Sequence, residues 1–269
     1  MNNSQVSDAL VVPDWPAPPG IRAVVTTRRL PGNSLPPFDA FNLGLRSGES
    51  EAVVQSNRAL LIRALGLPSA PRWLRQVHGT GVASFDSADC PNLTAARVAD
   101  AADDVVPAAE PEADAAVTRE RGVVLAILTA DCLPILLCAD DGSEVAALHA
   151  GWRGLSSGVI EACVGRMRGS PANLMAWLGP AIGPASYEVG DDVRAEFVAK
   201  NHAALGAFTA TRPGHWLCDL YTLARQRLRA FGIANVHGGG FDTRTDQRFY
   251  SYRRDGASSG RFASLIWIT

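Results

Sequence analysis

Three side chains that can bind a metal ion lie at or just beyond the ends of predicted strands. Cys132 follows residues 123–130, and His149 ends residues 145–149. His78 ends a short predicted strand, residues 73–78, further upstream. Open α/β sheets place ligands beyond the carboxyl ends of their strands, so we expect these three side chains to meet in one site. Their wide separation in the sequence matches no compact ligand motif, and the prediction therefore depends on the fold.

Two imidazoles and one thiolate suit zinc, and three protein ligands leave a fourth position open. Zinc in such a site lowers the pKa of a bound water to about 7. Asp131 is then a candidate general base or a residue that orients a ligand, and hydrogen bonding of the turn is an equally good role for it. Copper is the less favoured metal. The chain has only five histidines, and His202 and His215 are expected at the surface.

A metal-free alternative uses the same residues. Cys132 could act as a nucleophile activated by His149, with backbone N–H groups of the Gly151 turn as oxyanion donors. Cys138 and Cys163 fall in apolar periodic segments, which is typical of buried thiols with no catalytic role. Both explanations of Cys132 stay open at this point.

Several polar residues near predicted strand ends and turns are candidate substrate contacts. Gly151 and Gly154 permit a tight turn before a helix predicted over residues 156–167, whose N-terminus favours an anion such as phosphate. Guanidinium groups bind phosphate or carboxylate well, although surface salt bridges are their common alternative role. The candidate substrate-binding residues are Arg28, Asn42, Gln76, Arg153 and Arg253.

The hydrophobic pattern predicts a layered α/β protein. Residues 123–128 are apolar at both odd and even positions, which indicates a strand covered on both faces. The predicted strands are residues 21–27, 73–78, 115–118, 123–130, 135–138, 145–149, 174–178, 233–237 and 265–268. The predicted helices are residues 50–65, 156–167, 191–200 and 217–231.

Three regions are predicted along the chain. Residues 1–20 contain four prolines among polar residues, which favours a flexible tail. Residues 21–269 have no strong break in composition and are predicted to form a single domain. Residues 86–112, rich in Ala and Asp, are predicted to be a surface insertion within it.

The composition argues against several classes of partner. Lys plus Arg (25) nearly balances Asp plus Glu (27), so no basic field is present to bind nucleic acid. No apolar stretch reaches the roughly 20 residues of a membrane-spanning helix, and no signal peptide is evident. Five scattered cysteines fit reduced thiols. We expect a cytoplasmic protein that acts on small molecules, as a monomer or weak homo-oligomer.

Six segments together resemble the YfiH-like laccase-domain proteins, and the similarity runs from about residue 21 to the end. They are Arg-Gln-Val-His-Gly (75–79), Thr-Ala-Asp-Cys-Leu-Pro (129–134), His-Ala-Gly-Trp-Arg-Gly (149–154), Gly-Pro-Ala-Ile-Gly-Pro (179–184), Tyr-Glu-Val-Gly (187–190) and Phe-Tyr-Ser-Tyr-Arg-Arg (249–254). The chain departs from the family pattern at Ser186 and Asp242, where relatives often have cysteine.

The resemblance implies a four-layer α/β/β/α mixed-sheet sandwich, of the type shared with a cysteine-dependent deamidase toxin. It also implies zinc held by His78, Cys132 and His149. The implied activities are phosphorolysis of adenosine, inosine, guanosine or methylthioadenosine, and deamination of adenosine. A cysteine-dependent amidase that edits peptidoglycan precursors is the alternative. A copper polyphenol oxidase and a non-catalytic binding protein are less favoured.

Overall fold

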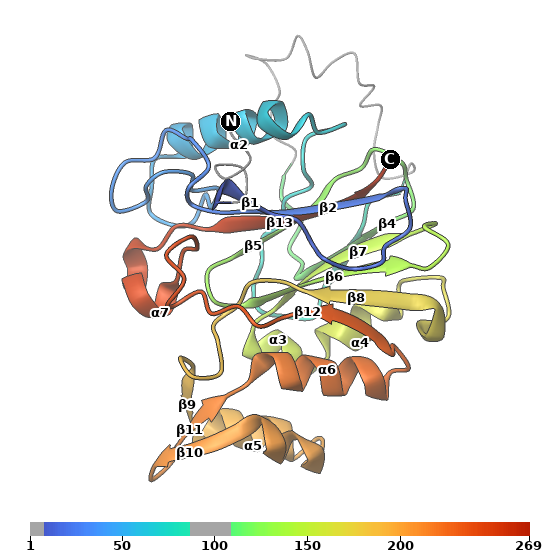
Figure 1. Ribbon diagram of the computed structural model, residues 1–269, viewed down its shortest axis with the longest axis vertical. Coiled ribbons are helices and arrows are strands. Elements are labelled where there is room, and N and C mark those ends of the chain that lie inside the picture. The colour runs from blue at the N-terminus through green and yellow to red at the C-terminus, as the bar shows by residue number, and fades with distance from the viewer. Residues whose placement is uncertain (1–7, 87–108) are drawn as a thin grey trace.

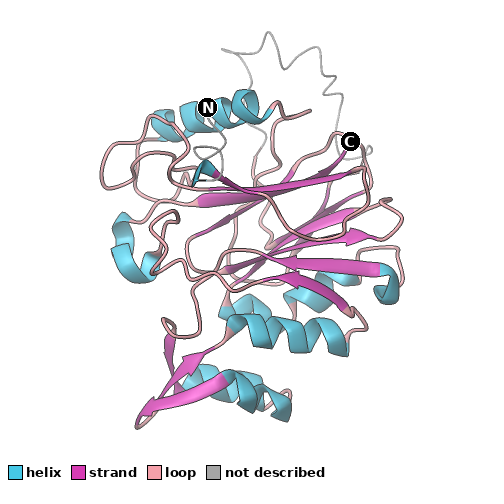
Figure 2. Ribbon diagram, in the orientation of Figure 1, coloured by secondary structure: helices cyan, strands magenta, loops and turns pink. Residues whose placement is uncertain are grey.

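The computed structural model describes residues 8–86 and 109–269, which form a mixed α/β fold with two large sheets packed face to face (Figures 1 and 2). The four-stranded sheet has the order β1 (Leu10–Val11), β2 (Ile21–Thr26), β13 (Phe262–Ile268), β5 (Leu125–Thr129). The six-stranded sheet has the order β12 (Asn235–Gly238), β8 (Leu174–Leu178), β6 (Leu133–Ala139), β7 (Val145–Ala150), β4 (Ala115–Thr118), β3 (Val82–Ser84).

Helices cover the two outer faces of this pair of sheets (Figure 1). Helix α2 (Glu51–Leu65) lies on the four-stranded sheet. The six-stranded sheet is covered by α3 (Trp152–Ser157), α4 (Val159–Val164) and α6 (Leu220–Ala230). The predicted four-layer α/β/β/α sandwich is therefore confirmed.

The remaining elements lie outside the four layers. A small third sheet, β10 (Phe208–Arg212), β11 (His215–Cys218) and β9 (Glu188–Gly190), packs with α5 (Asp191–Val198). Helix α7 (Tyr252–Asp255) precedes β13. Short 3₁₀ helices occupy Pro171–Asn173, His202–Ala207 and Gly256–Ser258. None of the helices in the described part of the chain is long and apolar enough to cross a membrane.

Successive side chains of a strand point to opposite faces of the sheet, and here both faces are covered. This explains why apolar residues occur at both odd and even positions. In β13, Ala263 and Leu265 pack in the cluster beneath α2, whereas Phe262 and Ile266 pack between the two sheets. Strands β5, β6, β7, β8 and β13 thus have two buried faces. The connection from β5 to β6 passes from one sheet to the other, and Asp131 and Cys132 lie in it.

The strand predicted over residues 73–78 does not form. The structure has only isolated bridges in this region, between Arg72 and Leu125 and between Arg75 and Glu112. The Gln76 side chain takes the place of a ladder, because its amide donates to the Leu128 carbonyl at 2.7 Å and accepts from the Leu128 N–H at 2.8 Å. Side-chain pairing of this kind has no periodic signal in the sequence.

Two predicted helices begin or end elsewhere. The helix predicted over residues 156–167 is split into α3 and α4, because Gly158 has φ +102° and interrupts it. Helix α3 starts earlier than predicted, with Gly151 as its N-cap. Helix α6 starts later, because the Asp219 side chain accepts the Thr222 N–H at 3.0 Å and caps it there.

Residues 8–20, which belong to the predicted N-terminal tail, contribute a strand to the fold. β1 pairs with β2, and Ala9 is buried. The Thr27 hydroxyl also donates to the Asp8 carbonyl at 2.8 Å, so this segment completes the edge of the four-stranded sheet. Residues 1–7 lie outside the described part of the chain, as do residues 87–108 of the predicted insertion.

Candidate metal centre

The fold brings His78, Cys132 and His149 together, and their ligand atoms all lie within 4.8 Å of one another. The Cys132 Sγ is 3.7 Å from the His78 Nε2. Tetrahedral zinc with bonds of about 2.0–2.3 Å separates its ligand atoms by roughly 3.3–3.6 Å, and the Cys132–His78 separation is close to that spacing. His78 is exposed and His149 is buried, so the cluster opens to solvent on the His78 side.

Asp131 fixes the backbone next to Cys132. It has φ +91°, a conformation that L-residues rarely adopt. Its Oδ1 accepts the Thr243 hydroxyl at 2.6 Å, and its Oδ2 accepts the Arg253 N–H at 2.6 Å. Both carboxylate oxygens are thus used within the chain, which favours the turn-holding role over that of a general base.

Asp114 is a member of the site that sequence reasoning missed. Its carboxylate contacts both the loop around His78 and the His149 ring. The available signal was an aspartate directly before the apolar residues 115–117, since an unpaired carboxylate is rarely buried.

Charge within the cluster favours a thiolate beside an imidazolium when no metal is bound. Burial raises the pKa of the Cys132 thiol, but His149 and His78 outweigh it and lower that pKa to about 6. Burial lowers the pKa of His149, but Cys132 and Asp114 outweigh it and raise that pKa to about 9. The thiolate is the form that binds a metal and also the form that acts as a nucleophile.

Alkylation of metal-free protein is expected to single out Cys132 among the described cysteines. A thiolate forms as the pH rises through its pKa, so labelling of Cys132 by iodoacetamide should be half-maximal near pH 6. Burial raises the pKa of Cys138, Cys163 and Cys218, so these thiols should stay unlabelled below pH 9. Peptide mass spectrometry at several pH values measures this. Half-maximal labelling near the usual value of about 8.5 would contradict the charge pairing.

Two of the predicted substrate contacts have exposed side chains beside the cluster. Arg153 follows the Gly151 turn on α3, with its guanidinium 4.4 Å from the Trp152 ring centre. Arg253 is on α7, where its backbone is tied to Asp131. Its guanidinium lies 5.2 Å from the Tyr187 ring centre and donates to the Glu188 carbonyl at 3.0 Å.

The other three predicted contacts are engaged within the chain. Gln76 is held by Leu128, as described above. Asn42 is fully buried, and its side chain bonds Ser47, Glu49 and backbone N–H groups. The structure therefore gives Gln76 and Asn42 structural contacts.

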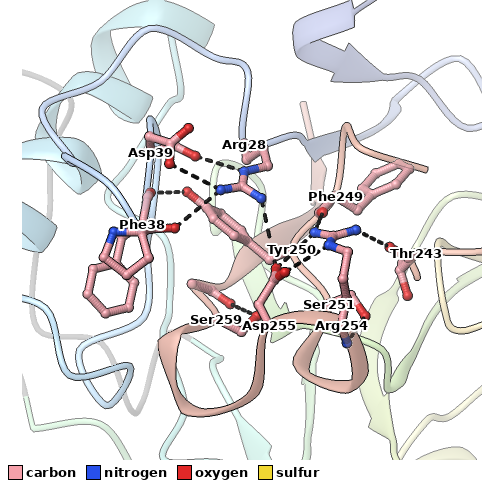
Figure 3. A network of polar contacts seen from close by, with 12 residues as sticks. Arg28, Phe38, Asp39, Thr243, Phe249, Tyr250, Ser251, Arg254, Asp255 and Ser259 are labelled. Carbon is pink, nitrogen blue, oxygen red and sulfur yellow. Dashed lines mark hydrogen bonds and ion pairs between the residues drawn. The ribbon is translucent and has the colours of Figure 1, made fainter. Parts of the chain in front are cut away.

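Arg28 belongs to a polar network that anchors the segment carrying α7 (Figure 3). Its guanidinium donates to the Asp39 carbonyl at 2.8 Å and lies 4.7 Å from the Tyr250 ring centre. Asp255 is 3.9 Å away and pairs with Arg254. Arg28 thus contacts the element that carries Arg253, with no contact to the three ligands themselves.

The two departures from the family pattern contact each other. The Ser186 hydroxyl donates to the Asp242 carboxylate at 2.6 Å, and the Gly183 N–H donates to the same carboxylate at 3.0 Å. These bonds join the loop before β9 to the loop before α7. Neither residue belongs to the ligand cluster.

The fold is a four-layer α/β/β/α sandwich, and its His-Cys-His cluster lies beside the connection that passes from one sheet to the other. Together these two features define the class of protein. The chain belongs to the family described as multi-copper polyphenol oxidoreductase laccase, whose profile matches residues 22–269. The resemblance to YfiH-like laccase-domain proteins is thereby confirmed.

Curated relatives and solved structures agree with this assignment. The chain is 52% identical over 265 residues, 96% of each chain, to a Xylella fastidiosa protein named purine nucleoside phosphorylase. It is 44% identical to an Escherichia coli protein named purine nucleoside phosphorylase YfiH, covering 96% of this chain and 98% of that one. A crystal structure from Neisseria meningitidis aligns with TM-score 0.84 and 39% identity, covering 97% of this chain and 99% of the other.

Proposed function

We propose that this protein is a zinc-dependent purine nucleoside phosphorylase. It would cleave adenosine, inosine, guanosine or methylthioadenosine with phosphate, releasing the free base and the sugar 1-phosphate. The observation that carries the proposal is the cluster of three ligand atoms within 4.8 Å, open to solvent on one side. Relatives with that name cover nearly the whole chain, which supports the nucleoside as substrate.

The reaction is a substitution at the C1′ carbon of the sugar. A phosphate oxygen bonds to C1′ while the bond from C1′ to the purine nitrogen breaks, and the purine leaves with the electron pair and takes up a proton. Zinc held by His78, Cys132 and His149 would supply a Lewis acid and activate water for the parallel deamination of adenosine. Copper is less favoured, because within the described residues no other histidine joins the cluster.

The chain's own residues would bind and orient the two substrates. Arg153 and Arg253 present exposed guanidinium groups on two elements that flank the cluster, and we assign phosphate binding to them. Asp131 would fix the positions of Cys132 and Arg253 relative to each other through its hydrogen bonds. Arg28 would support α7 from behind.

Tyr252 is the residue we expect to stack on the purine. Its side chain is 56% exposed, unusual for a large ring, and it precedes Arg253 on α7. Base stacking on an aromatic ring contributes about 1–3 kcal/mol, so Tyr252→Ala should raise the KM for adenosine about 5- to 150-fold with a smaller change in kcat. Steady-state kinetics measures this, with Tyr252→Phe as the control that keeps the ring. An unchanged KM in Tyr252→Ala would contradict the assignment.

Release of adenine from adenosine tests the proposal directly. The purified protein is incubated with adenosine, with and without phosphate, and the products are separated by chromatography. The proposal predicts adenine and ribose 1-phosphate only when phosphate is present, with inosine as a second product formed independently of phosphate. Metal-replete protein that forms none of these products would overturn it.

A metal-free cysteine amidase or deamidase is the second candidate. The observation that favours it is the low pKa of Cys132, about 6, beside an imidazolium. In that case chelators should leave the activity unchanged. Chelator-sensitive activity would exclude it.

A further inference from the structure

A single buried carboxylate contacts both histidines of the cluster. Asp114 is fully buried. Its Oδ1 accepts the His78 backbone N–H at 2.9 Å and lies 2.8 Å from the His149 Nδ1. Its Oδ2 accepts the backbone N–H groups of Val77 at 3.2 Å and Gly79 at 2.6 Å.

The position of Asp114 in the sheet explains these contacts. It directly precedes β4, which pairs antiparallel with β7, the strand that carries His149. The Asp114 carbonyl also accepts the His149 N–H at 2.7 Å. The main chain and the side chain of Asp114 therefore both hold His149.

The contact with His149 sets which ring nitrogen faces the other ligands. An ionised carboxylate only accepts hydrogen bonds, so the His149 Nδ1 carries the hydrogen. The Nε2 is then the ring nitrogen that gives up its hydrogen when a metal binds.

The contact with the His78 loop sets the backbone. His78 has φ +60°, which is uncommon for a residue other than glycine. Three consecutive N–H groups, from Val77 to Gly79, point at one carboxylate and stabilise that conformation. The His78 side chain projects from this turn toward Cys132.

We propose that Asp114 is the positioning residue of the metal centre, which directs the His149 Nε2 toward the metal by binding Nδ1 and which holds the His78 loop in place. This role rests on the metal centre of the proposed function. Asp114 itself touches neither metal nor substrate.

Glu144 provides the matched control. It is also buried and accepts backbone N–H groups, from Arg168 at 3.0 Å and Gly169 at 2.6 Å. It contacts none of the three ligands. A change at Glu144 therefore removes a carboxylate that holds a loop without affecting any of the three ligands.

Zinc titration of metal-free full-length protein tests the proposal. In Asp114→Asn the new NH₂ group opposes N–H donors that the carboxylate accepted, so zinc affinity should fall about 10- to 100-fold. Glu144→Gln should lower the melting temperature but keep the wild-type affinity. Folded Asp114→Asn with wild-type affinity would overturn the proposal, as would an equal loss of affinity in Glu144→Gln.

A measurement on the wild-type protein covers the case in which Asp114→Asn does not fold. Nitrogen-15 NMR of the histidine rings should show the His149 Nδ1 bearing the hydrogen in the zinc-loaded protein, assigned by its loss in His149→Gln. A hydrogen-free Nδ1 would overturn the proposal. Wild-type protein that binds zinc but cleaves no nucleoside would overturn only the proposed activity, whereas wild-type protein that binds no zinc would overturn both.

Discussion

Replacing Cys132 with serine is expected to abolish both zinc binding and phosphorolysis in a protein that stays folded. A neutral hydroxyl is a poor zinc ligand beside a soft thiolate. Loss of about 4 kcal/mol of transition-state stabilisation corresponds to a fall of about a thousand-fold in kcat/KM, and we expect at least that. Zinc analysis and the adenine-release assay measure the two effects.

The comparison with chelated wild-type protein makes this experiment decisive. If Cys132 is a metal ligand, removing the metal from the wild-type protein with a chelator should cause the same loss of activity as Cys132→Ser. Added zinc should then restore the activity of the wild type but not that of the variant. A nucleophile role predicts full activity after chelation. Cys138→Ala is the control, because its thiol is buried in β6 and should be silent in both assays.

Replacing Gly151 with alanine is the second change expected to have a large effect. A Cβ atom at this position would lie 2.8 Å from the His78 Cδ2 and 2.9 Å from the Cys132 Sγ, which is closer than real contacts permit. Gly151 has φ −64°, so alanine meets no backbone strain there. The added methyl group must therefore displace two of the three ligands.

Displacement of ligands by about 1 Å can cost about a hundred-fold in rate, and we expect kcat/KM in Gly151→Ala to fall by at least that factor. Zinc affinity should fall with it, while the melting temperature changes little. Gly206→Ala is the matched control, because a Cβ atom there meets nothing within 4 Å. Full activity in Gly151→Ala would show that the cluster is looser than the structure indicates.

The layered fold and the ligand cluster could be predicted because their signals are local. A strand buried on both faces needs apolar residues at odd and even positions alike, as β13 shows. Cys132 and His149 were predicted from their positions after such apolar runs, and His78 from a predicted strand that does not form, yet the structure brings the three ligand atoms together. Their chemical role in the protein stays a prediction.

The supporting contacts could not be predicted, because they join residues far apart in the chain. Gln76 was expected to bind substrate, yet its amide replaces strand pairing with Leu128. Asn42 was expected beside the substrate, yet it is buried among loop residues. Asp114 reaches both histidines only because β4 lies next to β7. Local patterns carry none of these pairings.

Positive φ angles at two non-glycine residues were likewise beyond sequence reasoning. His78 and Asp131 both adopt them, and both are held by hydrogen bonds from distant segments. Strained backbone of this kind concentrates at functional sites. It therefore supports the location of the site independently of the ligand types.

X-ray absorption at the zinc edge of the purified, zinc-loaded protein tests the central claim most directly. We expect one sulfur ligand at about 2.3 Å and two histidine nitrogens at about 2.0 Å. A zinc shell that contains no sulfur, or wild-type protein that binds no zinc, would contradict it.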